Sequence, residues 1–212
     1  MKNIYLLKQN NSLKNLHTAI RCKDSPLSMF VHKSDRIIRL LLEQAFDLLP
    51  YKDKSITTPI NAIFNGVEIN TNLCGVSIIR AGDSMASQLR LIDESIPIGK
   101  ILLQRDRVTK QPCYYYSNLP EGIENFHIFL LEPMLATGGS AIKAIDILLE
   151  KSVKESNIIL INFISSPVGI ERVNAIYPDV KIVTSSIEEG LNKDSFMIPG
   201  IGDFGDRYFG TK

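Results

Sequence analysis

Residues 128 to 149 combine a phosphate-type loop with a carboxylate. Ile128–Leu131 is a run of four large apolar residues that predicts a buried strand of a parallel sheet, and Glu132 follows it directly. Thr137–Ser140 is rich in small residues and precedes Ala141–Leu149, whose spacing predicts a helix. Backbone N–H groups and hydroxyls at such a helix N-terminus favour an anion. A carboxylate repels phosphate, so Glu132 would accept hydrogen bonds from hydroxyl groups of the phosphate's carrier, and the segment predicts a site for a phosphorylated sugar.

The same loop also has a purely structural interpretation. Gly138–Ser140 before a helix is typical of a plain strand-to-helix turn that carries an N-cap. Two nucleotide motifs are absent from the sequence. Ala141 and Ile142 follow Ser140, which excludes G-x-x-x-x-G-K-[ST], and no G-x-G-x-x-G follows a predicted strand. Nucleoside triphosphatase and dinucleotide-binding functions are therefore disfavoured.

Two further predicted strands end on an arginine. Leu73–Ile79 is followed by Arg80, and Ile98–Leu103 is followed by Gln104 and Arg105. In an open parallel sheet, ligands bind beyond the carboxyl ends of the strands. Each arginine alone is typical of a surface residue that closes a strand. Together with the glutamate after the third strand, the two guanidinium groups predict a site for a polyanionic sugar.

The elements that position these residues follow a strand and helix alternation. A wide apolar stripe predicts a helix from Ser34 to Leu49, and Asn65-Gly66 predicts the turn of a β-hairpin over 52–72. The alternation from 73 to 185 predicts an α/β fold with a mostly parallel sheet and helices on both faces. Further helices are expected over 85–92 and 167–176, strands over 157–164 and 180–185, and a loop around 21–30.

The segment 108–121 is expected to be an extended arm or hairpin outside the core. It contains Gln111-Pro112, Leu119-Pro120 and the run Tyr114–Tyr116. Three tyrosines can stack on a base, but such a run is more often strand packing or a subunit interface, and we favour that structural interpretation.

Composition limits the class of protein. The chain has 212 residues, 44% hydrophobic, with a formal net charge of +1, so one domain over 1–212 is expected and a nucleic-acid binder is disfavoured. Cys22, Cys74 and Cys113 lie far apart, which favours reduced thiols over a disulfide framework or a metal site. No segment has the pattern of a secretory signal or of a membrane span, so we expect a cytoplasmic location and no membrane partner.

The C-terminal segment from Met197 to Thr211 carries four glycines within eleven residues. Glycines allow the backbone to approach a flat ligand closely and leave amides and carbonyls exposed to it. The segment also contains Ile201, Phe204, Tyr208 and Phe209, which would be unusual in a solvated tail. We therefore expect it to fold back onto the body of the protein.

These residues carry a family resemblance over roughly 20–212. Glu132–Ser140 resembles the phosphoribosyl-diphosphate signature of uracil phosphoribosyltransferases, normally D-P-M-L-A-T-G-G-S. Pro199–Thr211 resembles that family's uracil-binding segment, and Ser34–Leu41, Ile79–Gly82 and Ile98–Asp106 resemble three further blocks in the same order. Phe204 and the stretch Arg80–Met85 are most similar to the eukaryotic-type branch.

The resemblance implies a type I phosphoribosyltransferase fold and the transfer of a 5-phosphoribosyl group from 5-phospho-α-D-ribose 1-diphosphate to uracil, giving UMP. It implies roles in catalysis for Arg80, Arg105, Glu132 and Asp203. The implied diphosphate-sugar site is Arg80, Ala81, Gly82, Arg105, Glu132, Pro133, Met134, Leu135, Ala136, Thr137, Gly138, Gly139, Ser140 and Asp203, and the implied uracil site is Met197, Gly202, Asp203 and Phe204.

The resemblance also implies Mg²⁺ carried with the diphosphate, without a dedicated protein metal site. It implies a homodimer or homotetramer, with the arm at 104–120 in the interface, and raises activation by GTP as in some relatives. Residues 1–20 would be an N-terminal extension, and 186–212 the base-binding segment.

Two departures from the family pattern bear on activity: Glu132 replaces the usual aspartate, and Ala86 replaces an acidic residue of the eukaryotic-type branch. Two other functions stay open at this point. One is a non-catalytic sensor of phosphoribosyl diphosphate or UMP, and the other is a transferase for another base.

Overall fold

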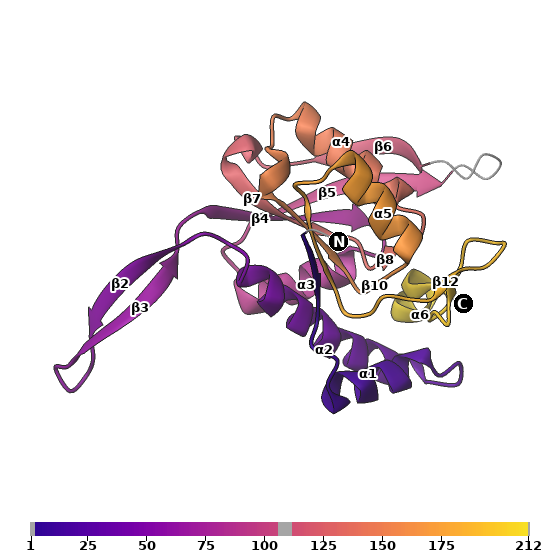
Figure 1. Ribbon diagram of the computed structural model, residues 1–212, viewed down its shortest axis with the longest axis horizontal. Helices are drawn as coiled ribbons and strands as arrows, with labels where there is room; N and C mark the ends of the chain where they lie inside the picture. The colour runs from indigo at the N-terminus through magenta and orange to yellow at the C-terminus, as the bar shows by residue number, and fades with distance from the viewer. Residues whose placement is uncertain (1–2, 106–111, 212) are drawn as a thin grey trace.

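The computed structural model describes residues 3–105 and 112–211 (Figure 1). Its centre is a seven-stranded sheet in the order β1-β11-β9-β7-β4-β5-β6, in which every neighbouring pair is parallel except β5 and β6. This confirms the α/β fold class. The strands are β1 (Ile4–Leu6), β4 (Asn72–Ile79), β5 (Ile98–Arg105), β6 (Pro112–Asn118), β7 (Phe126–Leu131), β9 (Ile158–Asn162) and β11 (Lys181–Thr184).

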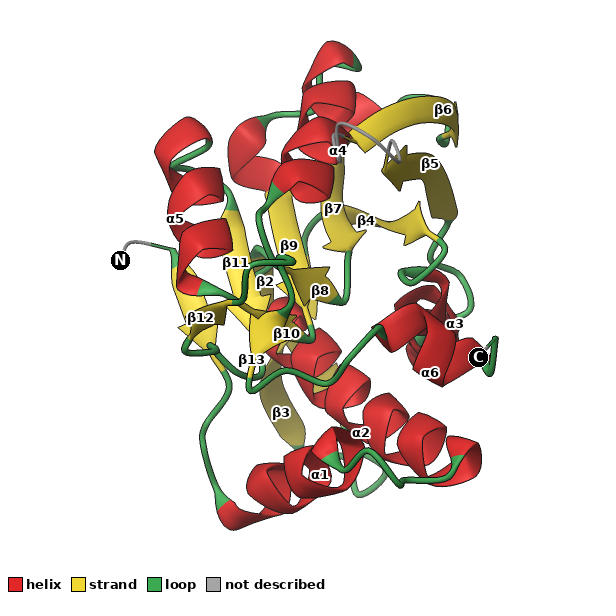
Figure 2. Ribbon diagram, turned by 90° about the vertical axis from the view of Figure 1, so that its right-hand side faces the viewer, coloured by secondary structure: helices red, strands yellow, loops and turns green. Residues whose placement is uncertain are grey.

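Helices cover both faces of the sheet (Figure 2). Along β7, Phe129 and Leu131 face one core cluster, while Ile128 and Leu130 face the other. Because successive side chains of a strand point to opposite faces, a strand buried on both sides is apolar throughout. The first cluster includes residues of α1 (Asn11–Arg21), α2 (Leu27–Phe46) and α3 (Asp83–Ile92), and the second includes residues of α4 (Gly139–Glu150) and α5 (Pro167–Ile176).

The N-terminal helices differ from the prediction. Helix α2 begins at Leu27 and not at Ser34, because its buried stripe extends one turn further back to Phe30. The expected loop around 21–30 is therefore confined to the residues between α1 and α2. Helix α1 was not predicted, and Asn10 caps it by accepting a hydrogen bond from the Leu13 N–H at 2.9 Å. The first twenty residues, expected as an extension, thus supply an edge strand and a packed helix.

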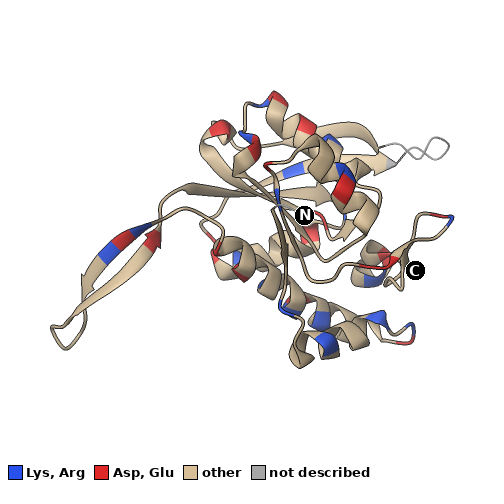
Figure 3. Cartoon of the chain, viewed as in Figure 1, with Lys and Arg blue, Asp and Glu red and all other residues tan. Residues whose placement is uncertain are grey.

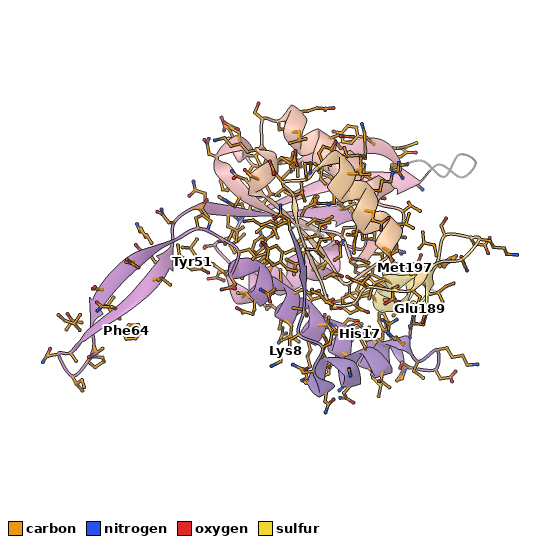
Figure 4. The ribbon with its side chains drawn as sticks, in the orientation of Figure 1. Lys8, His17, Tyr51, Phe64, Glu189 and Met197 are labelled. Atoms are coloured by element: carbon orange, nitrogen blue, oxygen red, sulfur yellow. The ribbon has the colours of Figure 1, made fainter. Side chains whose placement is uncertain are left out.

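The β-hairpin is present, but its turn was placed wrongly. Strands β2 (Tyr51–Thr57) and β3 (Ile63–Ile69) pair with Gly66 opposite Lys54, so Asn65-Gly66 lies within β3. The turn is the stretch between the strands, where the Thr58 N–H donates to the Ala62 carbonyl at 2.8 Å. The hairpin projects from the body, with Phe64 near its outer end (Figure 4). Its charges lie near the body, and the outer part carries none (Figure 3).

The predicted arm is partly built into the sheet. Residues 112–118 form β6, an antiparallel edge strand on β5, on which Tyr114–Tyr116 remain exposed. The part of the arm at 106–111 lies outside the described residues. Within the described chain, no helix combines the length and apolar character needed to cross a membrane.

Candidate functional site

A cavity of about 670 Å³ lies at the carboxyl ends of β4, β5 and β7. It brings together residues from three sequence regions that were predicted separately: the strand ends, the phosphate-type loop and the C-terminal segment. Of the predicted residues, its lining contains Arg80, Ala81, Glu132, Met134, Ala136, Ser140, Met197, Gly202, Asp203 and Phe204.

The other predicted residues are adjacent to the lining. Gly82, Pro133, Leu135, Thr137, Gly138 and Gly139 belong to the same loops but are not among the described lining residues. Arg105 is the last residue of β5, where it pairs with Pro112. Its side chain lies outside what the structure describes, so its predicted role stays a prediction.

The phosphate-type loop leads directly into the N-terminus of α4. Gly138 occupies the N-cap position with φ +77°, a conformation that glycine adopts without a steric penalty. No side chain of the described residues caps this helix. The N-terminus of α4, with Ser140 in the cavity lining, therefore lies where the sequence predicts an anion site.

Hydrogen bonds from helix α5 and its N-cap support the phosphate-type loop and the two residues before it. Ser166 is the N-cap of α5; its hydroxyl donates to the Ala136 carbonyl, and its N–H donates to the Leu135 carbonyl at 2.8 Å. Arg172 donates to the Thr137 carbonyl at 3.2 Å. A short parallel pair, β8 (Met134–Leu135) with β10 (Ile164–Ser165), adds a further tie. These contacts within the fold thus support the geometry of the loop.

Glu132 is held through its backbone at the end of β7. Its N–H donates to the Ile161 carbonyl at 3.2 Å, and its carbonyl accepts a hydrogen bond from the Asn162 side-chain amide at 2.6 Å. Asn162 is fully buried on the neighbouring strand β9. Both partners lie on β9, so this neighbouring strand fixes the backbone of Glu132 at the cavity.

Arg80 contacts the C-terminal segment. The peptide bond between Ile79 and Arg80 is cis. The Arg80 guanidinium donates to the Asp206 carboxylate at 2.8 Å and to the Thr211 hydroxyl at 3.0 Å. The sequence predicts a role for Arg80 but gives no sign of these two partners, which lie more than 120 residues away.

The C-terminal segment folds back onto the body, as predicted. Helix α6 (Phe204–Phe209) begins at the N-cap Asp203, whose carboxylate accepts a hydrogen bond from the Asp206 N–H at 2.8 Å. Phe204 is buried, with its ring centroid 5.8 Å from that of Phe30 and 5.2 Å from that of Phe163. This aromatic contact anchors the segment at the point where it lines the cavity.

Nine of the described lining residues were not predicted: Ile78, Ile79, Leu102, Leu103, Gln104, Asp194, Ser195, Phe196 and Gly205. Gln104 lies on β5, and Asp194, Ser195 and Phe196 form the turn between β12 (Gly190–Leu191) and β13 (Met197–Ile198). The Asn192 side chain organises this turn by accepting from the N–H groups of residues 194 and 196, both at 2.9 Å. The cluster of turn-forming residues at 192–195 was the signal that could have placed a loop here.

Ala86, which departs from the eukaryotic-type pattern, is buried on α3. The first turn of the same helix carries Asp83, which accepts from the Ser77 hydroxyl at 2.8 Å and pairs with Lys100 at 3.1 Å. The Asp83 carboxylate therefore belongs to an ion pair within the fold.

His17 makes stability depend on pH. It is buried on α1, with Nε2 3.0 Å from the Ser185 hydroxyl oxygen. Burial first, and the Arg21 charge second, lower its pKa from 6.5 to about 4, although Glu188 opposes the shift. The folded state thus keeps His17 neutral, while the unfolded state protonates below pH 6.5. The stability that neutral His17 contributes is fully present above pH 6.5 and is lost as the pH falls towards 4.

We expect the free energy of unfolding to fall by about 2 kcal/mol through His17 alone between pH 7 and pH 5. Urea unfolding at both pH values, with wild type and His17→Gln, measures this difference. His127→Gln is measured in parallel, because burial first and then Lys181 also lower the pKa of His127, and its part of the pH slope has to be separated from that of His17. A wild-type pH slope that persists in His17→Gln would contradict the assignment.

Comparison with known proteins gives a consistent result. Residues 7–211 match the family model described as uracil phosphoribosyltransferase. The chain is 48% identical over 210 residues to uracil phosphoribosyltransferase 1 of Schizosaccharomyces pombe, covering 99% of this chain and 96% of that protein. It is 47% identical over 211 residues to the uracil phosphoribosyltransferase of Dictyostelium discoideum, covering 100% and 98%.

Among solved structures, the AQ2163 protein of Aquifex aeolicus superimposes with a TM-score of 0.84 at 26% identity. The alignment covers 97% of both chains. The similarity therefore extends over the sheet and its helices as well as the cavity.

Proposed function

Because the chain belongs to the uracil phosphoribosyltransferase family, we propose that it transfers the 5-phosphoribosyl group of 5-phospho-α-D-ribose 1-diphosphate to uracil, giving UMP and diphosphate. The observation that carries this proposal is the single cavity lined by Arg80, Glu132, Ser140 and Asp203. In this cavity, the strand-end arginine matches the diphosphate, and the strand-end carboxylate matches the ribose hydroxyls. The helix N-terminus matches the 5′-phosphate, and the glycine-rich backbone matches the uracil base.

The 5′-phosphate occupies the loop Thr137–Ser140 in this proposal, where the amides at the start of α4 and the dipole of that helix offset its charge. The Glu132 carboxylate accepts hydrogen bonds from the ribose 2′- and 3′-hydroxyls. Its fixed backbone supports this role, because a carboxylate held in place orients the ring without rearranging.

The diphosphate lies next to Arg80 and the backbone of Ala81 and Gly82. Asp206 and Thr211 take two of the five N–H donors of Arg80, which leaves other donors of the guanidinium for the diphosphate oxygens. Arg105 is a second candidate contact, placed by the end of β5.

Uracil binds the backbone of Gly202–Phe204, beside Met197. Amides and carbonyls there pair with the alternating donors and acceptors of the base. The exocyclic amine of cytosine would face the wrong partner and leave polar groups unpaired, which gives selectivity for uracil.

In the reaction, the bond between ribose C1′ and the diphosphate oxygen breaks, uracil N1 forms the new bond to C1′, and the N1 proton passes to water or to the departing diphosphate. Positive charge develops on the ribose and negative charge on the leaving diphosphate, so a fixed guanidinium stabilises the transition state more than the ground state. We propose Mg²⁺ as the cofactor: bound together with the diphosphate, it would offset further negative charge on the leaving group. The described residues contain no cluster of three metal-binding side chains, while Glu132 and Asp203 offer carboxylate oxygens at the cavity.

The test is UMP formation from labelled uracil and phosphoribosyl diphosphate, with and without Mg²⁺. Turnover supports an enzyme, whereas binding of the sugar diphosphate without turnover would indicate a sensor. Calorimetry with uracil, guanine and UMP distinguishes the base. Tight binding of guanine without uracil would indicate a transferase for another base.

The Glu132 carboxylate gives a specific prediction. We expect Glu132→Gln to lower kcat/KM for the sugar diphosphate by about tenfold to a hundredfold, because hydrogen bonds to a charged acceptor are lost. Glu132→Asp keeps the charge and restores the family's usual residue, so we expect it to retain more activity than the glutamine variant. Steady-state kinetics on both variants measure this order, and a fully active Glu132→Gln would remove Glu132 from the ribose site.

We propose that the chain forms a homo-oligomer. The projecting hairpin supports this, because its outer part exposes Ile60, Ile63 and Phe64, with Ile60 85% exposed, on a segment without charges. The exposed tyrosines 114–116 on β6 are a second candidate surface, within the expected 104–120 interface. Sedimentation with and without GTP measures whether the species is a dimer or a tetramer and whether GTP shifts it.

A cytoplasmic location is also proposed. Cys22 and Cys74, which form no disulfide, support it, because reducing compartments keep cysteines as thiols. Fractionation of cells that express the chain tests it.

A further inference from the structure

A buried ion pair lies next to the cavity without lining it. The Glu188 side chain is 1% exposed, and the Arg21 guanidinium meets it with two parallel hydrogen bonds, Nη1 to Oε2 at 2.8 Å and Nη2 to Oε1 at 2.7 Å. The Ser186 hydroxyl adds a third hydrogen bond at 2.9 Å. Burial raises the pKa of Glu188, but the hydrogen bonds from Arg21, Gly200 and Ser186 outweigh it and lower that pKa overall.

Both ends of this ion pair hold the same backbone residue. The Gly200 N–H donates to Glu188 Oε2 at 2.7 Å, and the Gly200 carbonyl accepts from Arg21 Nη1 at 3.0 Å. Gly200 has φ +67°, and a Cβ there would lie 2.2 Å from the Met197 carbonyl oxygen. The turn between Met197 and Gly202 is therefore tight, and the ion pair is hydrogen-bonded to Gly200 near its centre.

Arg207 ties the same turn to helix α1. Its guanidinium donates to the Ile201 carbonyl at 2.8 Å and to the carbonyls of Ile20 and Cys22, at 2.6 and 2.7 Å, at the end of α1. Arg21, at the last position of α1, is the residue that holds Gly200. Hydrogen bonds from the C-terminal end of α1 and from Arg207 thus hold the backbone proposed to bind the base.

We propose that Arg21 and Glu188 are positioning residues for uracil: the pair fixes Gly200 and thereby the backbone at Met197 and Gly202–Phe204. This inference rests on the proposed function of that backbone. Neither residue belongs to the described cavity lining, so each acts through the turn and not by touching substrate. A displaced turn would misalign the amides and carbonyls that read the base, while the phosphate-type loop, held by α5, would keep its geometry.

The test measures KM for each substrate separately in Glu188→Gln and Arg21→Lys. We expect KM for uracil to rise about tenfold or more, KM for the sugar diphosphate to change by less than about twofold, and the preference for uracil over cytosine to fall. Glu68→Gln is the matched control, because Glu68 forms an exposed ion pair with Lys54 on the hairpin. It should leave both KM values unchanged.

An equal loss for both substrates, or a lower melting temperature with both KM values unchanged, would overturn the inference and make the pair merely structural. If Glu188→Gln fails to fold, Arg21→Lys decides by the same comparison of the two KM values. The Arg21 side chain is 23% exposed, and the substitution by lysine keeps the positive charge. A wild-type protein without uracil turnover would instead refute the proposed function, so the two failures are distinguishable.

Discussion

Arg80→Ala is expected to lower kcat/KM for phosphoribosyl diphosphate by about a hundredfold to a thousandfold. The loss follows from the proposed reaction, in which the departing diphosphate gains charge next to this guanidinium. Arg80 is also placed before substrate arrives, because Asp206 and Thr211 hold it at 2.8 and 3.0 Å. A preorganised charge costs no rearrangement at the moment of reaction, which is why its removal has a large effect. Steady-state kinetics measure the loss.

Two controls separate charge stabilisation from structural damage in the Arg80 experiment. Arg90 is an exposed arginine on α3, and Arg90→Ala should leave kcat/KM unchanged. Asp206→Asn keeps Arg80 but weakens its anchor, so we expect a smaller loss than in Arg80→Ala. Equal activity in Arg80→Ala and Arg90→Ala would show that the diphosphate binds elsewhere.

Gly169→Ala is expected to lower the free energy of unfolding by about 1–3 kcal/mol, and to weaken binding of the sugar diphosphate. A Cβ at this position would lie 2.5 Å from the Ala136 carbonyl oxygen and 2.8 Å from that of Leu135. These atoms are backbone, so α5 or the phosphate-type loop has to move. Alanine is the better helix former, by about 1 kcal/mol, so a net loss identifies the steric conflict.

Urea unfolding and calorimetry with phosphoribosyl diphosphate measure the two effects of Gly169→Ala. Gly190→Ala is the matched control, because a Cβ at Gly190 meets nothing within 4 Å. Normal stability and normal binding in Gly169→Ala would mean that the loop tolerates displacement and that its support by α5 is not needed for the phosphate site.

The sequence predicted best where local chemistry and burial agree. Helix α5 runs from Pro167 to Ile176 as predicted, because proline fits the first helical position and loses no hydrogen bond there. Within β7, the stretch Ile128–Leu131 was recognisable because it is buried on both faces and apolar throughout. In these segments the sequence pattern and the tertiary structure impose the same requirement.

Prediction was wrong where tertiary packing determines the structure. Asn65-Gly66 is a strong turn signal, but Gly66 pairs with Lys54 inside the hairpin, because the turn formed at 58–62 instead. Helix α1 was missed because one of its four buried positions is His17, which interrupts the apolar pattern. A buried histidine is accepted there only because Ser185, far along the chain, meets it.

The candidate site was predictable as a set of residues but not as an arrangement. The residue types at 80, 132, 137–140 and 203 identified the chemistry. The site depends on two sets of hydrogen bonds, one between Arg80 and Asp206 and one from Gly200 to Arg21 and Glu188. These bonds join residues that lie from 12 to 179 positions apart in the sequence. Such contacts are set by the order of strands in the sheet, and local sequence patterns do not encode that order.

The position of α6 has a consequence for biosynthesis. The ribosome delivers Asp203–Thr211 after every other described residue that lines the cavity. Asp203–Thr211 supplies part of the base site and both partners of Arg80. Premature termination before Asp203 would therefore leave the phosphate-type loop and Glu132 without these contacts, and the truncated chain would lack part of the base site.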